Sequence, residues 1–169
     1  MHDNIKKRIN IAAKRQPADL VIKNCKIVNV FTHEIIEGDI AISDGKIAAV
    51  GNYSGEKEVD AEGRYALPGF INSHIHIESS FVSPEEFSRL VVPHGTTTII
   101  ADPHEIVNVC GMDGFDYMVK AGKNAALDIK YMIPSCVPCT PWEHAGAVVD
   151  SKAISEVINQ DKVLSLIHI

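Results

Sequence analysis

The sequence lacks the features that mark several large classes of protein. Basic residues are not in excess, because 16 Lys and Arg stand against 22 Asp and Glu, which gives the 169 residues a formal net charge of −6. A nucleic-acid-binding domain would instead carry a basic patch or stripe. No apolar run approaches the roughly 18 residues that a membrane-spanning helix needs, and the charged N-terminus is not followed by the apolar segment of a signal peptide. We therefore expect a cytoplasmic protein with no nucleic-acid or membrane partner.

Aromatic and cysteine residues are scarce as well. Aromatic residues make up 6% of the chain and hydrophobic residues 46%, a composition that suits one ordinary globular domain and excludes a disordered chain. The four cysteines, in a chain without a secretion signal, predict reduced thiols rather than a disulfide framework. Cys136 and Cys139 form a lone C-x-x-C pair, which is half of a typical zinc site, and this favours two ordinary thiols over a metal or redox site.

The first 67 residues predict a helix followed by a small β unit. Residues 1–16 contain apolar side chains at helical spacing, and Pro17 ends that pattern. Residues 17–67 contain short runs with β propensity, separated by turn signals at Asp44-Gly45 and Glu62-Gly63. These strands are too few for an independently stable sheet, so we expect the β unit to pack against further protein.

Residues 70–78 contain a group of ionisable side chains at strand spacing. Side chains alternate between the two faces of a strand, so His74, His76 and Glu78 are expected to share one face. Two neutral imidazoles one residue apart converge on a point where a divalent metal can be held. The His-x-His pattern taken alone is equally compatible with an ordinary polar strand face.

Strands and helices are predicted to alternate after this segment. Ser83 followed by Pro84 and Glu86 is typical of a helix N-terminus with a capping box. The β-branched run 96–101 predicts a strand. The next expected elements are a helix over 114–127, a strand over 129–133 and a loop over 134–138.

This alternation predicts an α/β fold built from parallel βα units, the start of a (β/α)8 barrel. Such a barrel needs about 250 residues, so residues 68–163 would supply only its first three units. The active site of the fold lies at the C-terminal ends of the strands. His104 and Glu105, which follow the strand 96–101, are therefore expected near the His-x-His pair.

Four short motifs stand at the ends of these elements: LPGFI at 67–71, HIHIESS at 74–80, PHGTTT at 93–98 and ADPHE at 101–105. Through the first two, the chain resembles the amidohydrolase superfamily. Through the Glu-Ser-Ser and Asp-Pro-His-Glu continuations it is similar, within that superfamily, to the bacterial and archaeal adenine deaminases. The resemblance extends from about residue 17 to residue 160.

The resemblance implies a metal-dependent (β/α)8 barrel and a small β-sandwich to which both ends of a much longer chain contribute. It implies hydrolytic deamination of adenine to hypoxanthine and ammonia, as in purine salvage, by water that a metal activates. Manganese is the expected metal, with iron or zinc as alternatives, and a homodimer is implied. The implied metal ligands are His74 and His76, and the residues placed to hold substrate or move protons are Glu78, His104 and Glu105.

Several alternatives stay open at this point. The superfamily takes its other metal ligands from later barrel strands, so we expect an N-terminal fragment that is inactive alone. Residues 164–169 look like a translated sequencing adapter, which predicts a non-native tail. Another amidohydrolase, such as a hydantoinase, a dihydroorotase or a deacetylase, would share the His-x-His pair. A non-catalytic binding module is the third possibility.

Overall fold

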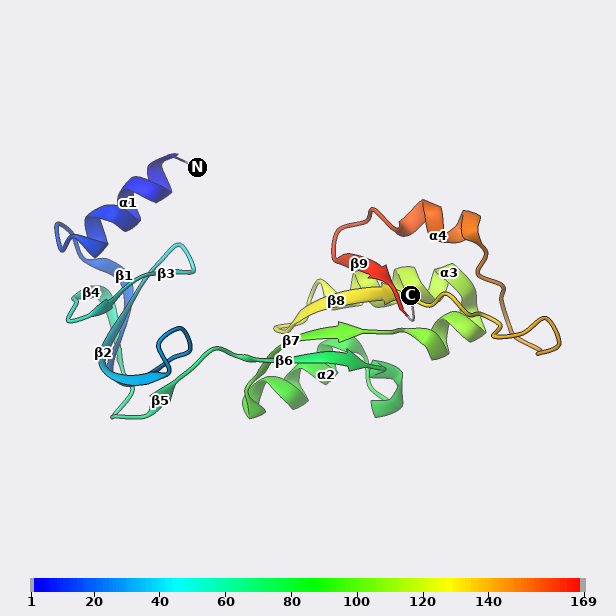
Figure 1. Ribbon diagram of the computed structural model, residues 1–169, viewed down its shortest axis with the longest axis horizontal. Coiled ribbons are helices and arrows are strands. Elements are labelled where there is room, and N and C mark those ends of the chain that lie inside the picture. Colours follow the sequence, from blue (N-terminus) through cyan, green and yellow to red (C-terminus); the bar gives the residue numbers. More distant parts are fainter. Residues whose placement is uncertain (1, 168–169) are drawn as a thin grey trace. The chain divides into compact units, whose positions relative to one another are not determined.

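The computed structural model describes residues 2–167 (Figure 1). The chain divides into two compact units, Met1–Pro68 and Gly69–Ile169. No helix in the described part of the chain is long and apolar enough to cross a membrane.

The first unit is one helix with a five-stranded sheet. Its strand order is β3-β2-β1-β4, and β5 pairs with β1. Strand β1 pairs antiparallel with β2 but parallel with both β4 and β5, which follow one another along the same edge of β1. The elements are α1 (His2–Ala12), β1 (Ala18–Asn29), β2 (Glu34–Ser43), β3 (Lys46–Gly51), β4 (Gly55–Asp60) and β5 (Tyr65–Ala66).

Both turns predicted from the sequence are present. Asp44 and Gly45 join β2 to β3 with φ values of 51° and 69°. Two successive positive φ angles match the twist of a tight hairpin, and Asp and Gly tolerate them at little steric cost. Glu62 and Gly63 also have positive φ. Their turn leads from β4 to β5 and makes no hairpin, because both strands pair with β1.

The first unit has a small core on one side and an exposed apolar surface elsewhere. Ile11 of α1 is fully buried against Val21 of β1 and Ala41 of β2. By contrast, Ile47 and Val50 of β3 are 66% and 44% exposed and line an apolar groove. Contiguous exposed apolar surface marks an interaction site in soluble proteins, which agrees with the expectation that this β unit packs against further protein.

A buried carboxylate connects three segments of the first unit. Asp39 in β2 accepts hydrogen bonds from Lys23 Nζ at 2.6 Å, and from the backbone N–H groups of Asn24 and Tyr53, each at 3.1 Å. Burial by itself raises the pKa of the Asp39 carboxyl, but these three donors outweigh it, so that its pKa lies below the usual value of 3.8.

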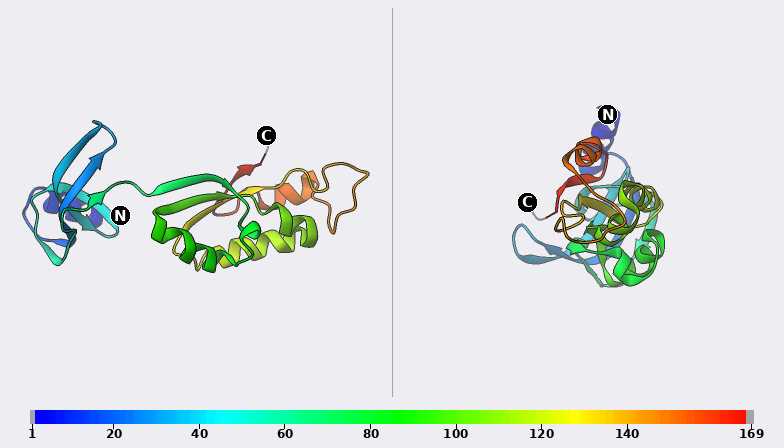
Figure 2. Two further views of the ribbon diagram at one scale, coloured as in Figure 1. Left: turned by 90° about the horizontal axis from the view of Figure 1, so that it is seen from below. Right: turned by 90° about the vertical axis from the view of Figure 1, so that its right-hand side faces the viewer.

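The second unit is a parallel sheet with its strands in sequential order, β6-β7-β8-β9. Helices α2 and α3 lie along one face of this sheet (Figure 2). This is the arrangement of consecutive βα units at the start of a (β/α)8 barrel, so the predicted fold class is confirmed. The strands are β6 (Phe70–Ile75), β7 (Thr96–Ala101), β8 (Asp128–Ile133) and β9 (Val163–Leu166); the helices are η1 (Ile77–Ser80), α2 (Pro84–Val91), η2 (Val92–His94), α3 (His104–Gly122) and α4 (Ser151–Val157).

The core of the second unit lies between the sheet and α3. Phe115 of α3 and Tyr131 of β8 are both buried, with ring centroids 6.2 Å apart in an edge-to-face arrangement. The Tyr131 hydroxyl donates a 2.6 Å hydrogen bond to the backbone carbonyl of Met118. This packing fixes the later part of α3 on the sheet, and the fully buried Val107 anchors the residues at the beginning of that helix.

Two expected boundaries were wrong, although Ser83 does cap α2 through the Glu86 N–H as predicted. Strand β6 ends at Ile75, so Glu78 lies in the 3₁₀ helix η1 and not on a strand face. Helix α3 begins at His104 instead of residue 114, because two helical segments join at a kink at Gly111, where φ is 63°.

The C-terminal part contains two elements that the sequence analysis did not predict. Helix α4 begins after Asp150, whose side chain accepts a hydrogen bond from the Ala153 N–H in the manner of an N-cap. Strand β9 then pairs parallel with β8. Of the tail expected at 164–169, residues 164–166 lie in β9, and 168–169 lie outside the described residues.

The Asp39 interactions predict a loss of stability at acid pH. Because folding lowers the pKa of Asp39, its carboxylate stabilises the first unit above the usual Asp pKa, and this contribution disappears as the pH falls through the lower folded value. Amide protection factors in β1 and β2, measured by hydrogen exchange, should therefore fall as the pH drops below about 4.

Asp39→Asn should reduce protection at neutral pH and make the acid-induced loss smaller. Glu56→Gln, at an exposed position in β4, serves as the control and should retain the unaltered profile. Identical profiles for the two variants would contradict the role given to Asp39.

Candidate metal centre

Parallel pairing of β6 and β7 brings three potential metal ligands together. His74 lies in β6, His76 directly follows it, and Asp102 directly follows β7. Ile75 pairs with Ala101, and the Asp102 N–H donates a 2.8 Å hydrogen bond to the Ile75 carbonyl. The three side chains therefore leave the sheet at the same edge, the C-terminal ends of the strands.

The distances in this group fit two imidazoles and a carboxylate around one ion. Asp102 Oδ2 lies 3.8 Å from both His74 Nε2 and His76 Nε2. This separation is too long for a hydrogen bond. Two ligand atoms that each lie about 2.1 Å from a metal are at most about 4.2 Å apart, so the observed 3.8 Å satisfies that limit.

Burial and donor chemistry agree with a divalent metal. The Asp102 side chain is fully buried, His76 is half-buried and His74 is more exposed. A buried carboxylate is costly unless a cation or hydrogen-bond donors compensate its charge. Imidazole nitrogen and carboxylate oxygen together suit manganese, iron and zinc. The residues present therefore fit the metal that the family pattern implies.

Glu105 orients one of the two imidazoles. It lies in the first turn of α3, and its Oε2 is 2.9 Å from His76 Nδ1. A carboxylate at this distance favours the tautomer in which Nδ1 carries the proton and donates it. Nε2, the nitrogen nearest Asp102, is then deprotonated and available to a metal.

Glu78, in the 3₁₀ helix η1, contacts the first turn of α3. Its Oε1 accepts a 3.2 Å hydrogen bond from the backbone N–H of Ile106. Burial raises the pKa of the Glu78 carboxyl, and the negative charge of Glu105 acts in the same direction. Glu78 is thus anchored by one oxygen beside the residue that orients His76.

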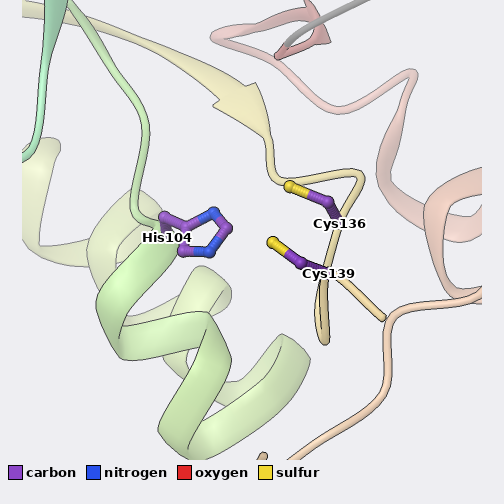
Figure 3. Close-up of side chains that lie close together, drawn as sticks. All are labelled: His104, Cys136 and Cys139. Carbon is purple, nitrogen blue, oxygen red and sulfur yellow. The ribbon is translucent and has the colours of Figure 1, made fainter. Parts of the chain in front are cut away.

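His104 is brought near a different pair of side chains. Its ring centroid lies 6.5 Å from that of His76. The ring itself stands beside the thiols of Cys136 and Cys139, which lie in the loop after β8 (Figure 3). The structure thus places His104 next to the metal centre but not within the group of His74, His76 and Asp102.

Asp102 is not among the site residues expected from the sequence, although it belongs to one of the four motifs. A usable signal was present, because an acidic residue that directly follows a buried strand of a βα unit lies at the active-site edge of the fold. The spacing between the strands does not reveal that Asp102 faces the His-x-His pair, because that requires the register of β6 against β7.

Comparison with known proteins agrees with this geometry. The sequence model of the amidohydrolase family matches residues 65–167. Adenine deaminase 2 of Desulfotalea psychrophila is 62% identical over 162 residues, and the adenine deaminase of Geobacillus kaustophilus is 53% identical over 169 residues. The matches cover 96% and 100% of this chain but only 28% and 29% of those proteins. The chain therefore spans less than a third of the length of these curated relatives.

Solved structures agree on the fold. The D-hydantoinase from Thermus sp. has a TM-score of 0.54 and 24% identity, and the match covers 68% of this chain and 27% of that one. The atrazine chlorohydrolase TrzN from Arthrobacter aurescens TC1, complexed with zinc, has a TM-score of 0.58 and 18% identity. That match covers 87% of this chain and 46% of the TrzN chain. At these identities the likeness concerns the fold, and it supports a partial (β/α)8 barrel.

Substitution of a proposed ligand should cause a specific loss of metal binding. His76→Ala removes one imidazole and should weaken Mn²⁺ binding by about tenfold or more, since even residues that only orient a ligand contribute 10–100-fold. The electron paramagnetic resonance signal of unbound Mn²⁺ measures the affinity. His94→Ala is the matched control, because His94 is exposed in η2, ahead of β7. An equal loss of binding in both variants would exclude this centre.

Proposed function

The chain belongs to the amidohydrolase family, and from this premise we propose that it is part of an adenine deaminase, which hydrolyses adenine to hypoxanthine and ammonia. One observation carries the proposal. His74, His76 and Asp102 converge at the C-terminal edge of the sheet, within a segment that is 62% identical to a curated adenine deaminase. A cyclic-amide hydrolase is supported less well, because the hydantoinase structure is only 24% identical.

We propose that His74 and His76 hold a divalent metal together with Asp102, and that this metal is Mn²⁺. A carboxylate donor and two imidazoles suit Mn²⁺, and iron or zinc would be accepted by the same atoms. When bound, such a metal supplies a hydrolytic water that is deprotonated near neutral pH.

The remaining residues at this edge are proposed to position groups and to move protons. Glu105 holds the His76 imidazole through Nδ1, which keeps Nε2 directed toward Asp102. Glu78, held by the Ile106 N–H through one oxygen, moves a proton at the purine ring nitrogen through its other oxygen. His104 borders the substrate from the beginning of α3.

The wider setting is part of the same proposal. We propose that residues 1–16 and 17–67 contribute the helix and part of a small β-sandwich, that 68–163 begin the barrel, and that further strands of the longer protein cover the exposed apolar surface of the first unit. Ile47 and Leu67, which are more than half exposed, support such a covered surface. The longer protein would act in purine salvage in the cytoplasm, as a homodimer, with adenine as its small-molecule partner.

A chimera tests the activity directly. The segment of Desulfotalea psychrophila adenine deaminase 2 that matches this chain is replaced by the residues of this chain, and the product is loaded with Mn²⁺. Ammonia release from adenine is expected, because the replaced segment would supply equivalent ligands. The same chimera should not hydrolyse hydantoin or dihydroorotate. A folded, metal-loaded chimera that hydrolyses a cyclic amide but not adenine would overturn the proposal.

Two variants of the chimera separate the proposed roles. Glu105→Gln removes the carboxylate that orients His76 and should lower kcat about 10–100-fold while metal content falls. Glu78→Gln should lower kcat about 10²–10⁴-fold with metal content unchanged, since proton transfer alone is affected. His94→Ala serves as the control. Equal losses of metal in the two glutamate variants would contradict this division.

The 169-residue chain alone should release no ammonia from adenine. It contributes two imidazoles and one carboxylate to the centre, and its sheet contains four strands of the eight that a closed barrel needs. An ammonia assay with the purified chain, adenine and Mn²⁺ checks this prediction. Turnover of adenine by that chain would contradict it, because it would show that the centre needs no further strands or ligands.

A further inference from the structure

We propose that His104, Cys136 and Cys139 form a second metal site, which takes a thiophilic ion, Zn²⁺, through one imidazole and two thiolates. This site goes beyond the proposed deaminase function and shares no residue with the group of His74, His76 and Asp102.

The fold brings the three side chains together from two βα units. His104 is the first residue of α3, after β7, and both cysteines lie in the loop that follows β8. One ligand atom from each residue lies within 4.8 Å of the other two. Figure 3 shows the sulfur atoms of Cys136 and Cys139 directed toward the imidazole of His104.

The loop that carries the cysteines is held in place by the protein itself. Val137, between the two cysteines, is buried in the core of the second unit, and its carbonyl accepts a 2.8 Å hydrogen bond from the Val149 N–H. The Cys139 N–H donates to Glu143 Oε2 at 3.2 Å. A C-x-x-C segment fixed in this way presents its two thiols on the same side, without the ordering cost of a mobile loop.

The dimensions suit zinc. With Zn–S bonds of about 2.3 Å and Zn–N bonds of about 2.0 Å, neighbouring ligand atoms of a tetrahedral site lie roughly 3.5–3.8 Å apart. The ligand atoms of His104, Cys136 and Cys139 lie within 4.8 Å of one another, so side-chain movements of about 1 Å would bring them into that range. Such movements are available, since Cys139 is exposed and Cys136 and His104 are half-buried.

The donor set distinguishes this site from the first centre. Thiolates select Zn²⁺ and other soft ions, whereas the carboxylate in the first group is a ligand that Mn²⁺ accepts well. Three protein ligands leave the fourth tetrahedral position open to water or a small molecule. A bound ion would join the beginning of α3 to the loop after β8. This is the edge of the sheet at which the ring centroids of His76 and His104 lie 6.5 Å apart.

The lone C-x-x-C pattern of Cys136 and Cys139 favours ordinary thiols, because no second pair accompanies it in the sequence. The structure supplies the missing partner from a distant part of the chain. The third ligand is an imidazole on another element, and its approach to the cysteines depends on the neighbouring positions of β7 and β8.

Cobalt binding tests the site. The purified, reduced, metal-free 169-residue chain is titrated with Co²⁺ under anaerobic conditions. One equivalent should produce the near-ultraviolet thiolate-to-cobalt charge-transfer band and the visible bands of tetrahedral Co²⁺, and Zn²⁺ should then abolish both. Cys136→Ser and Cys139→Ser should each remove the charge-transfer intensity or weaken Co²⁺ binding at least tenfold. Cys110→Ser is the matched control, because Cys110 is exposed and lies outside the group.

A second readout uses the same molecule as its own control. Zn²⁺ should slow alkylation of Cys136 and Cys139 at least tenfold, measured by peptide mass spectrometry, and leave the rate at Cys110 unchanged. The same comparison in the chimera applies the test where the barrel is complete. Absence of the thiolate band, or equal alkylation rates with and without Zn²⁺ in both proteins, would overturn the proposal.

The test of the zinc site is independent of the deaminase proposal. Co²⁺ bound by His74, His76 and Asp102 gives no thiolate band, so His74→Ala should leave the charge-transfer intensity intact. A chimera without adenine deaminase activity that still shows zinc protection would refute the first proposal and retain this one.

Discussion

The parallel pairing of β6 with β7 is the interaction on which the candidate centre depends. The hydrogen bond from the Asp102 N–H to the Ile75 carbonyl extends this pairing by one residue beyond β7. It places a buried carboxylate opposite two imidazoles that leave the adjacent strand. Because the side-chain period of a strand is two residues, a slip of one residue would turn the ligands of one strand to the other face. The register is thus a condition for any metal chemistry at this edge.

Helix α3 extends this arrangement to the third strand. Phe115 packs on Tyr131 of β8 after the Gly111 kink, and before the kink the buried Val107 anchors the segment whose first turn presents His104 and Glu105. Glu105 therefore supplies the carboxylate that orients His76. The adjacent residue, His104, lies beside the two thiols that follow β8. The segment of α3 before the Gly111 kink, which the buried Val107 anchors in the core, can thus serve both proposed groups of ligands.

The features that the sequence could predict are those that local rules determine. The turn at Asp44 and Gly45 follows from backbone sterics, and the α2 N-terminus follows from Ser83 and the residues next to it. The end of β6 at Ile75 could not be found by alternation alone, because a 3₁₀ turn begins two residues later. The early start of α3 was hidden by the kink at Gly111, which breaks the helical period. The partners of Asp102 and His104 lie on other strands, so only the paired sheet reveals them.

The three proposed ligands of the first centre differ in burial. Asp102 is fully buried, and His76 is oriented by Glu105. His74 lies on β6, an outer strand of the described sheet on which Phe70 and Ile71 are 57% and 67% exposed. A closed barrel has no outer strand, so in a complete barrel a further strand would cover β6 and restrict its side chains. His76 and Asp102 are therefore the more buried of the three proposed ligands, and a strand paired with β6 in a complete barrel would reduce the exposure of His74.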